Sequence, residues 1–230
     1  MFASVPSGAP ILVIDAESND ETARLARAYG ALVLVRPWEG FVETRRYALE
    51  YVRTPWTFML DADEMIDQQL RDALLGLEPP SDVDGYIVRR TTFFVGRPIE
   101  GCGWGDESPL RLFRSGVAQL VPHPAGGGAA DVHEEWRVPG GVELLHGRLL
   151  HDSYPTLAAY WQKFHRYTSI EARGLRPTAA AALRTIGVAL ARVFWLYFGR
   201  RGYRDGWRGA VIAFASAFYP VVVLFKAVGR

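Results

Sequence analysis

Apolar and polar positions follow two alternating patterns in the first sixty residues. Short runs rich in branched side chains, which are typical of buried strands, occupy residues 11–14, 32–35 and 56–60. The segments between them, residues 18–29 and 43–52, are predicted to be helices. The succession of strand, helix, strand, helix and strand with short connections predicts an α/β fold. Its sheet is expected to be mostly parallel, with right-handed crossovers and flanking helices.

Polar and glycine residues mark where these helices begin and end. Ser18 and Glu21 have the Ser-x-x-Glu spacing of a capping box, which predicts a helix from Ser18 to about Tyr29. Gly30 is placed to end that helix in a left-handed conformation. Pro55 breaks the second helix, because the residue before a proline disfavours helical geometry.

Strand-like segments continue through the middle of the chain and give way to helices after residue 155. Further strands are predicted at residues 85–92, 110–114 and 142–145, with glycine-rich loops at 101–105 and 126–128. From Thr156 onward the apolar spacing is helical, and Pro177 separates two helices. These patterns predict an α/β domain over residues 1–155 and a helical extension over residues 156–230.

The composition is that of a folded protein with a substantial core. Of the 230 residues, 49% are hydrophobic and 22% are charged, which excludes a disordered chain. The formal net charge of +1 predicts no nucleic-acid partner. Cys102 is the single cysteine, so we expect neither an internal disulfide nor a cysteine-built metal site, but a small buried side chain in a reducing compartment. Residues 1–10 lack the pattern of a signal peptide.

Two acidic groups follow predicted strands. Asp15 comes after the first strand, and residues 61–64 come after the third. Because ligands of such sheets bind beyond the carboxyl ends of the strands, this placement predicts a site. Asp61 and Asp63 can turn their carboxylates toward one point, where they would suit Mg²⁺ or Mn²⁺ bound to substrate phosphates. Acting as a Lewis acid, such an ion neutralises the charge that develops on a diphosphate leaving group.

An Asp-x-Asp pair alone is a weak signal. The alternative is a solvated helix N-terminus with Asp63 as its cap. The nucleophile loop of a haloacid-dehalogenase phosphatase would need a threonine or serine soon after the second aspartate, whereas Glu64 and Met65 follow here. The apolar strand before Asp61 and the predicted helix after it favour the ligand site.

Several segments taken together resemble family 2 glycosyltransferases. They are Ile-Leu-Val-Ile-Asp-Ala-Glu-Ser-Asn-Asp-Glu-Thr at 11–22, Arg-Pro-Trp-Glu-Gly-Phe at 36–41 and Leu-Asp-Ala-Asp-Glu at 60–64. Within that family the chain is most similar to the lipopolysaccharide core β-1,4-glucosyltransferase branch. The later segments that agree with this branch are residues 111–114, 132–134, 149–154 and 166–168. The resemblance covers nearly the whole chain from Ile11, and the order of the segments is more specific than any one motif.

The resemblance implies a GT-A fold and an inverting transfer from a nucleotide-diphospho-sugar, in particular a UDP-sugar. It places Asp61 and Asp63 on a divalent metal, Mg²⁺ or Mn²⁺, with Asp61 also contacting the nucleotide. It places Asp15 near the base or ribose. Arg45 matches a family arginine that meets the phosphate or the base.

The resemblance also indicates which residues accept the proton of the acceptor hydroxyl. Glu134 stands where such transferases often carry their acidic base, and His133 is the rival because a neutral imidazole can accept the same proton. His151 is a candidate third metal ligand or a diphosphate contact. The alternative for His151 is an ordinary structural histidine.

The chain departs from the family pattern in two places. Family members normally open with a strand of the type Ile-x-Thr-x-Asn-Glu that carries part of the nucleotide pocket, and the sequence as given begins after it. Either Met1 is an internal methionine or this form lacks the strand. Thr44 and Arg46 stand where the family usually has glutamine and asparagine, which leaves donor specificity open.

The C-terminal residues predict contact with a membrane surface. Residues 209–228 are almost wholly apolar and reach the length of a span, about 20 residues, although Pro220 and Lys226 disfavour a span. The preceding residues that suit an anionic interface are Arg200, Arg201, Arg204, Arg208, Trp195, Tyr197, Tyr203 and Trp207. We expect peripheral or shallowly inserted helices at the cytoplasmic face of the cell membrane. The alternative is an apolar tail packed on the chain's own core or on a second subunit.

The function that these features predict is a hexosyltransferase. We expect a nucleotide-sugar as the donor and glucose as the candidate for the transferred hexose. The expected acceptor is a lipid-linked or lipopolysaccharide-type saccharide. The alternative is a membrane-associated, non-catalytic binding module that has lost part of the nucleotide site with the first strand.

Overall fold

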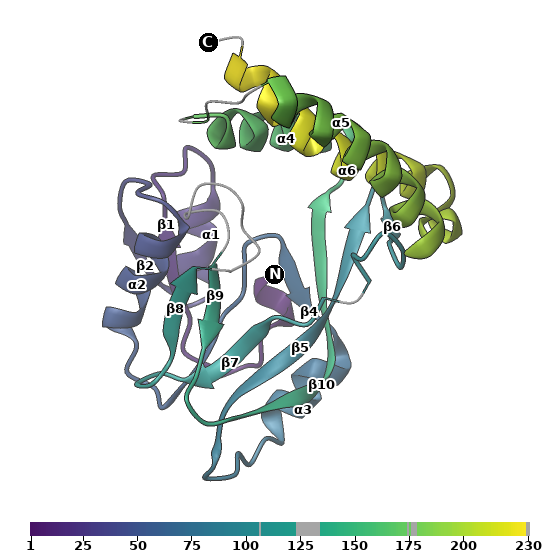
Figure 1. The fold of residues 1–230 in the computed structure, drawn as a ribbon. Helices are drawn as coiled ribbons and strands as arrows, with labels where there is room; N and C mark the ends of the chain where they lie inside the picture. The colour runs from purple at the N-terminus through teal and green to yellow at the C-terminus, as the bar shows by residue number, and fades with distance from the viewer. Residues whose placement is uncertain (106, 123–133, 174, 176–178, 229–230) are drawn as a thin grey trace. The chain divides into compact units, whose positions relative to one another are not determined.

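The computed structural model in Figure 1 divides into two compact units. It describes residues 1–105, 107–122, 134–173, 175 and 179–228. Unit 1 comprises Met1–Arg89 and Ser108–Leu149, and unit 2 comprises Arg90–Glu107 and Leu150–Arg230. The predicted division into residues 1–155 and 156–230, with its assignment of functions, stays a prediction.

Unit 1 holds the alternating strands and helices of the first half of the chain. After a 3₁₀ turn (Phe2–Ser4), its elements are β1 (Leu12–Asp15), α1 (Thr22–Ala28), β2 (Leu32–Val35), α2 (Phe41–Tyr51), β3 (Trp56–Phe58), β4 (Glu64–Ile66), α3 (Gln68–Leu75), β7 (Leu110–Arg114), β8 (Gln119–Pro122) and β9 (Glu134–Arg137). Two long strands, β5 (Val83–Phe94) and β10 (Gly141–Tyr154), contribute to both units.

Unit 2 is mainly helical. Its elements are β6 (Arg97–Pro98), α4 (Leu157–Glu171), α5 (Ala179–Phe194), a π-helical turn (Trp195–Gly199), a 3₁₀ turn (Gly202–Asp205) and α6 (Gly206–Val228). Helix α6 packs against both α4 and α5, and the three helices lie side by side in Figure 1. The sequence therefore predicts the helical second half correctly, including the break between two helices.

The strands form three sheets. β1 and β2 pair in parallel, with Leu12 opposite Leu32. A six-stranded sheet has the order β3-β7-β5-β10-β4 with β6 beside β5, and β8 pairs with β9. The pairs β3–β7, β5–β6, β5–β7 and β8–β9 are antiparallel.

The α/β class is confirmed, but the predicted parallel pairing of the third strand is wrong. β3 pairs antiparallel with β7 and is not in the sheet of β1, so the parallel pairing predicted for the first three strands holds for β1 and β2 but not for β3. The physical reason is that an apolar run reports burial, and burial does not fix the direction of the neighbouring strand. Within the described residues, no strand joins β1 to β3.

Local side-chain contacts shorten the first helix. Helix α1 begins at Thr22 after Glu21, so the predicted start at Ser18 is wrong. The Ser18 N–H donates to Asp15 Oδ2 at 3.3 Å and holds the residues after β1 in a loop. The predicted left-handed end of the helix is confirmed, because Gly30 has φ +81°.

Each unit has its own apolar core. The buried cluster of unit 1 is Ile66, Leu70, Val83, Tyr86, Val88, Leu112, Leu145 and Leu149. That of unit 2 is Phe94, Ile99, Cys102, Tyr160, Phe164, Leu196, Ile212, Ala213, Ala215 and Ala217. The expected burial of the single cysteine is confirmed, and burial, followed by the charge of Asp205, raises the pKa of the Cys102 thiol to about 11.

Helix α6 is apolar on both its packed and its exposed faces. Within the described residues, the segment Gly202–Val228 is the one helix whose length and mean hydropathy of 2.1 would allow it to cross a membrane. One face, which includes Ile212 and Ala213, is buried in the unit 2 core. Phe214 and Phe225 are 55% and 77% exposed on the other face. Packing on the chain's own core therefore accounts for only part of the apolar surface.

Candidate functional site

A tight turn carries the Asp-x-Asp pair between β3 and β4. The Glu64 N–H donates to the Asp61 carbonyl oxygen at 3.0 Å, and the Asp61 N–H donates to Glu64 Oε2 at 3.1 Å. The first of these is the bond of a β-turn, and the second is like the bond that the glutamate of a capping box accepts. This closure fixes the backbone from which the Asp61 carboxylate projects.

Arg111 anchors the turn from the neighbouring strand. The Met59 N–H donates to the Arg111 carbonyl oxygen at 2.8 Å, which places Arg111 of β7 beside the end of β3. Its Nη2 donates to Asp61 Oδ2 at 2.9 Å and to Glu64 Oε1 at 2.6 Å. The side chains of Arg111 and Glu64 are 6% and 0% exposed, so this ion pair lies inside unit 1. Removing one partner of such a pair strongly destabilises a protein, because the other charge then lies in the interior without a partner.

Arg45 of α2 binds the other oxygen of the same carboxylate. Its Nη2 donates to Asp61 Oδ1 at 3.1 Å, and the two side chains are 19% and 34% exposed. Burial alone would raise the pKa of Asp61, but the charges and hydrogen bonds of Arg111 and Arg45 outweigh it and lower the pKa below its usual value. Asp61 is therefore ionised at neutral pH and is held between two guanidinium groups.

Asp63 and Asp15 have different surroundings. Asp63 lies in the same turn as Asp61 and is half-buried. The proposed role of Asp63 as a helix cap is wrong, because Asp67 caps α3 by accepting the Leu70 N–H at 2.8 Å. Asp15 ends β1 and is buried, and among the described residues its carboxylate is hydrogen-bonded to the Ser18 N–H. Asp61 and Asp63 thus lie in one turn, and Arg45 contacts Asp61.

The structure describes only some of the predicted proton acceptors and the predicted third metal ligand. His133 is outside the described residues, and Glu134 is described only as the first residue of β9. His151 belongs to unit 2, where its Nε2 is 2.8 Å from Ser153 Oγ. The roles of these three residues stay predictions.

The carboxylates at the turn suit an ion that shares its ligands with a phosphate. Within the ranges that the structure describes, no group of three or more His, Cys, Asp and Glu residues converges on one point. Mg²⁺ is commonly held by one or two carboxylates together with substrate phosphates, so Asp61 and Asp63 fit that arrangement and do not form an all-protein cage. Asp61 already faces two arginines, so a cation would have to compete with Arg45 for Oδ1.

Sequence reasoning gave no role to two of the residues that build the site, Arg111 and Glu64. A signal for Arg111 was present, because it is a charged residue between two leucines in the strand Leu-Arg-Leu-Phe-Arg. An arginine at an inward strand position needs a buried acidic partner. The acidic run at residues 61–64 offers one, but only the antiparallel pairing of β3 with β7 shows that the two segments meet.

Comparison with known proteins agrees with this class of fold, a mixed α/β transferase of the GT-A type. Residues 9–98 match the model of the family described as "Glycosyl transferase family 2". The chain is 32% identical to an uncharacterized glycosyltransferase of Rickettsia felis, over 94% of this chain and 79% of that protein. It is 28% identical to the lipopolysaccharide core biosynthesis glycosyltransferase LpsC of Rhizobium meliloti, over 95% of this chain and 82% of that protein. The chain belongs to glycosyltransferase family 2.

Proposed function

We propose that this glycosyltransferase moves a hexose, with glucose as the candidate, from a UDP-sugar to a lipid-linked or lipopolysaccharide-type saccharide. The observation that carries the proposal is the Asp61 carboxylate, which is ionised, fixed by a closed turn and flanked by Arg45 and Arg111. The acceptor class is supported by the similarity to LpsC, whose name refers to lipopolysaccharide core biosynthesis.

In this proposal the turn holds the donor diphosphate. Asp61 and Asp63 bind Mg²⁺ or Mn²⁺, which when bound neutralises charge on the leaving diphosphate. Arg45 is the mobile partner, because its contact with Asp61 is partly exposed and its guanidinium can turn to a phosphate oxygen. Arg111 is buried and keeps Asp61 Oδ2 in place while Arg45 exchanges partners.

The remaining predicted residues complete the proposed transfer with inversion. An acceptor hydroxyl oxygen bonds to the anomeric carbon while the bond to the diphosphate breaks. The hydroxyl proton passes to the carboxylate of Glu134, with His133 as the rival acceptor. Asp15 contacts the base or ribose, and His151 meets the metal or the diphosphate.

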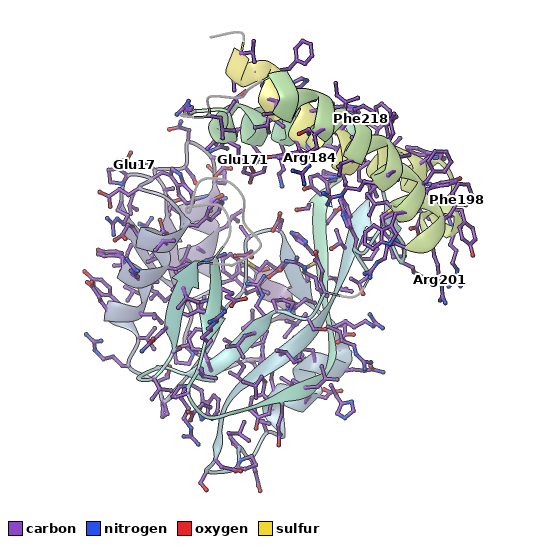
Figure 2. The ribbon with its side chains drawn as sticks, viewed as in Figure 1. Glu17, Glu171, Arg184, Phe198, Arg201 and Phe218 are labelled. Atoms are coloured by element: carbon purple, nitrogen blue, oxygen red, sulfur yellow. The ribbon has the colours of Figure 1, made fainter. Side chains whose placement is uncertain are left out.

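We further propose that unit 2 lies on the cytoplasmic face of the cell membrane. Exposed aromatic side chains at the end of the α5–α6 pair support this location: Phe194, Trp195, Phe198, Tyr203 and Trp207. Figure 2 shows Phe198 and Arg201 projecting from that end.

Arg208 was expected at the membrane surface together with Arg200, Arg201 and Arg204, but its side chain makes contacts within unit 2. Its Nε and Nη2 donate to the carbonyl oxygens of Phe94 and Val95, at 3.2 Å and 2.9 Å. This arginine therefore ties α6 to β5 inside unit 2. A side chain with this role contributes less to lipid binding than an exposed one.

The proposed reaction is tested by Mn²⁺-dependent transfer or hydrolysis of UDP-sugars. Asp61→Asn removes the negative charge at the turn, and we expect it to abolish turnover. Asp72→Asn makes the same chemical change on the exposed face of α3 and should leave turnover unaltered. Equal turnover in the two variants would show that Asp61 takes no part in the reaction, whereas no turnover by the wild-type protein would favour the non-catalytic binding module.

A further inference from the structure

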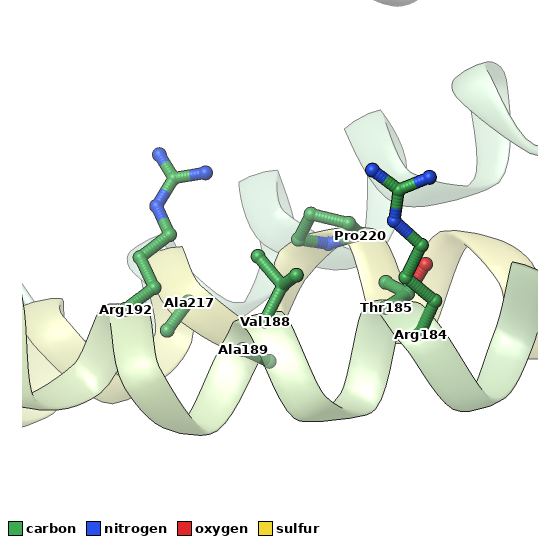
Figure 3. Close-up of a pocket in the computed structure, with 7 residues that line it drawn as sticks. All are labelled: Arg184, Thr185, Val188, Ala189, Arg192, Ala217 and Pro220. Atoms are coloured by element: carbon green, nitrogen blue, oxygen red, sulfur yellow. The ribbon is translucent and has the colours of Figure 1, made fainter.

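Unit 2 carries a groove that the proposed transfer chemistry does not use. It has a volume of about 430 Å³ and lies between α5 and α6 (Figure 3). The residues that line this arginine groove are Arg184, Thr185, Val188, Ala189, Arg192, Ala217 and Pro220. Every one of them belongs to unit 2, so the groove is complete within one compact unit.

The rim of the arginine groove is positively charged. Arg184, Val188 and Arg192 are four residues apart along α5, so they lie along one side of the helix. Figure 3 shows the two guanidinium groups projecting from the helix on either side of Val188. Neither arginine has an ion-pair partner among the described residues, and no acidic residue lines the groove. Two unneutralised cations on one rim favour an anionic ligand.

The floor of the groove is apolar. Val188, Ala189, Ala217 and Pro220 contribute it, and the small side chains of Ala189 and Ala217 are each 1% exposed between the two packed helices. A free phosphate would gain nothing from this floor. A molecule with both a phosphate and a hydrocarbon chain would satisfy the arginines and cover the apolar surface.

The opposite side of α5 favours a lipid as the source of that phosphate. Ile186, Leu190 and Phe194 are spaced by four residues and offset by two from the arginines, which places them on the far side of the helix. They are 39%, 54% and 67% exposed. A helix with cations along one side and exposed bulky apolar residues along the other is typical of helices that lie in a bilayer interface.

We propose that the arginine groove binds the phosphate of a membrane lipid, with Arg184 and Arg192 on the phosphate and the floor against the hydrocarbon chain. The inference rests on the proposed membrane location of unit 2 but not on the transfer reaction. It gives unit 2 a preference for lipids with a net negative phosphate headgroup over zwitterionic phosphatidylcholine, whose phosphate charge is balanced by choline.

Vesicle co-sedimentation of the full chain tests the groove. The wild-type protein should bind phosphatidylcholine vesicles that contain phosphatidic acid more tightly than phosphatidylcholine alone. The double variant Arg184→Gln/Arg192→Gln should lose about thirtyfold in binding to phosphatidic acid, since each basic residue near an anionic surface contributes about fivefold. Val188→Trp fills the groove without a change of charge and should remove the same preference.

Matched controls separate the groove from general charge attraction. Arg27→Gln/Arg173→Gln removes two exposed arginines elsewhere and should bind like the wild type. Equal losses in both double variants, or an unchanged preference in Val188→Trp, would overturn the proposal. So would displacement by millimolar inorganic phosphate, which would indicate a soluble anion site. UDP binding, measured in parallel, should be the same in all variants, so a failure of the proposed transfer is recognised separately.

Discussion

The proposed donor site depends on Asp61, whose environment is set by two arginines of unequal burial. Arg111 reaches it from β7 with a side chain that is 6% exposed, whereas Arg45 reaches it from α2 and stays partly open to solvent. The Asp-x-Asp spacing pointed to Asp61 from the sequence alone. Its partner Arg111 could not be predicted, because the contact depends on how two strands fifty residues apart pair.

The buried pair of Arg111 and Glu64 should dominate the stability of the turn. We expect Arg111→Met to lower the free energy of unfolding by about 3–5 kcal/mol, since Glu64 would keep a buried charge without its partner. The double variant Arg111→Met/Glu64→Gln should regain part of the lost free energy of unfolding, because the unpaired buried charge is removed. Arg114→Met, in the same strand but half-buried, is the control and should cost less. Urea unfolding of the four proteins checks the ranking, and equal costs for Arg111 and Arg114 would contradict it.

The lowered pKa of Asp61 predicts how stability depends on pH. The folded pKa lies below the unfolded value of about 3.9, so the contribution of Asp61 is fully present above that pH and is lost as the pH falls through the folded pKa. The difference in unfolding free energy between wild type and Asp61→Asn should therefore be constant near neutral pH. It should shrink below about pH 4. If the difference in unfolding free energy between the two proteins instead grew as the pH fell, the pKa of Asp61 would not be lowered by folding.

At the scale of elements, the sequence predicted where most strands and helices lie but not how strands pair. Residues 110–114 were predicted as a strand and form β7 with the same bounds, because the burial of Leu112 and Phe113 at its centre leaves a short apolar run in the sequence. β10 was predicted at residues 142–145 and extends over Gly141–Tyr154. Its polar residues, among them His146 and Arg148, conceal a strand whose length is set by pairing with neighbours.

A glycine in β10 shows how closely this strand packs on α3. Gly147 has φ +100°, and a Cβ at this position would lie 2.1 Å from the Leu70 backbone nitrogen. Gly147→Ala should therefore destabilise the protein well beyond the cost of a left-handed residue. Gly30→Ala, at φ +81° with open space around it, isolates that cost, about 1–2 kcal/mol. Thermal unfolding compares the two, and a Gly147→Ala protein as stable as Gly30→Ala would contradict the packing.

At the scale of the whole molecule, composition correctly predicted a large core and a buried cysteine. It did not predict that residues 90–107 join the C-terminal helices in unit 2. That association depends on long-range contacts, such as the hydrogen bond from the Cys102 N–H to the Arg200 carbonyl oxygen at 2.9 Å. Because side-chain periodicity is local, it carries no information about partners one hundred residues away.

Cys102 offers a probe of unit 2. The thiol is 6% exposed and its pKa is raised to about 11, so little thiolate is present near pH 8 and a reagent has poor access. We expect a disulfide reagent such as DTNB to label the native protein very slowly and to label it at once in denaturant. A rapid reaction of the native thiol would show that this core is open.

The claim that Asp61 and Asp63 hold the donor diphosphate is tested most directly by calorimetric titration of UDP in the presence and absence of Mn²⁺. The account predicts that wild-type protein binds UDP more tightly with Mn²⁺. It also predicts that Asp61→Asn and Asp63→Asn remove this dependence, while Asp72→Asn retains it. UDP binding that is Mn²⁺-dependent and unchanged in both site variants would show that the turn is not the donor site.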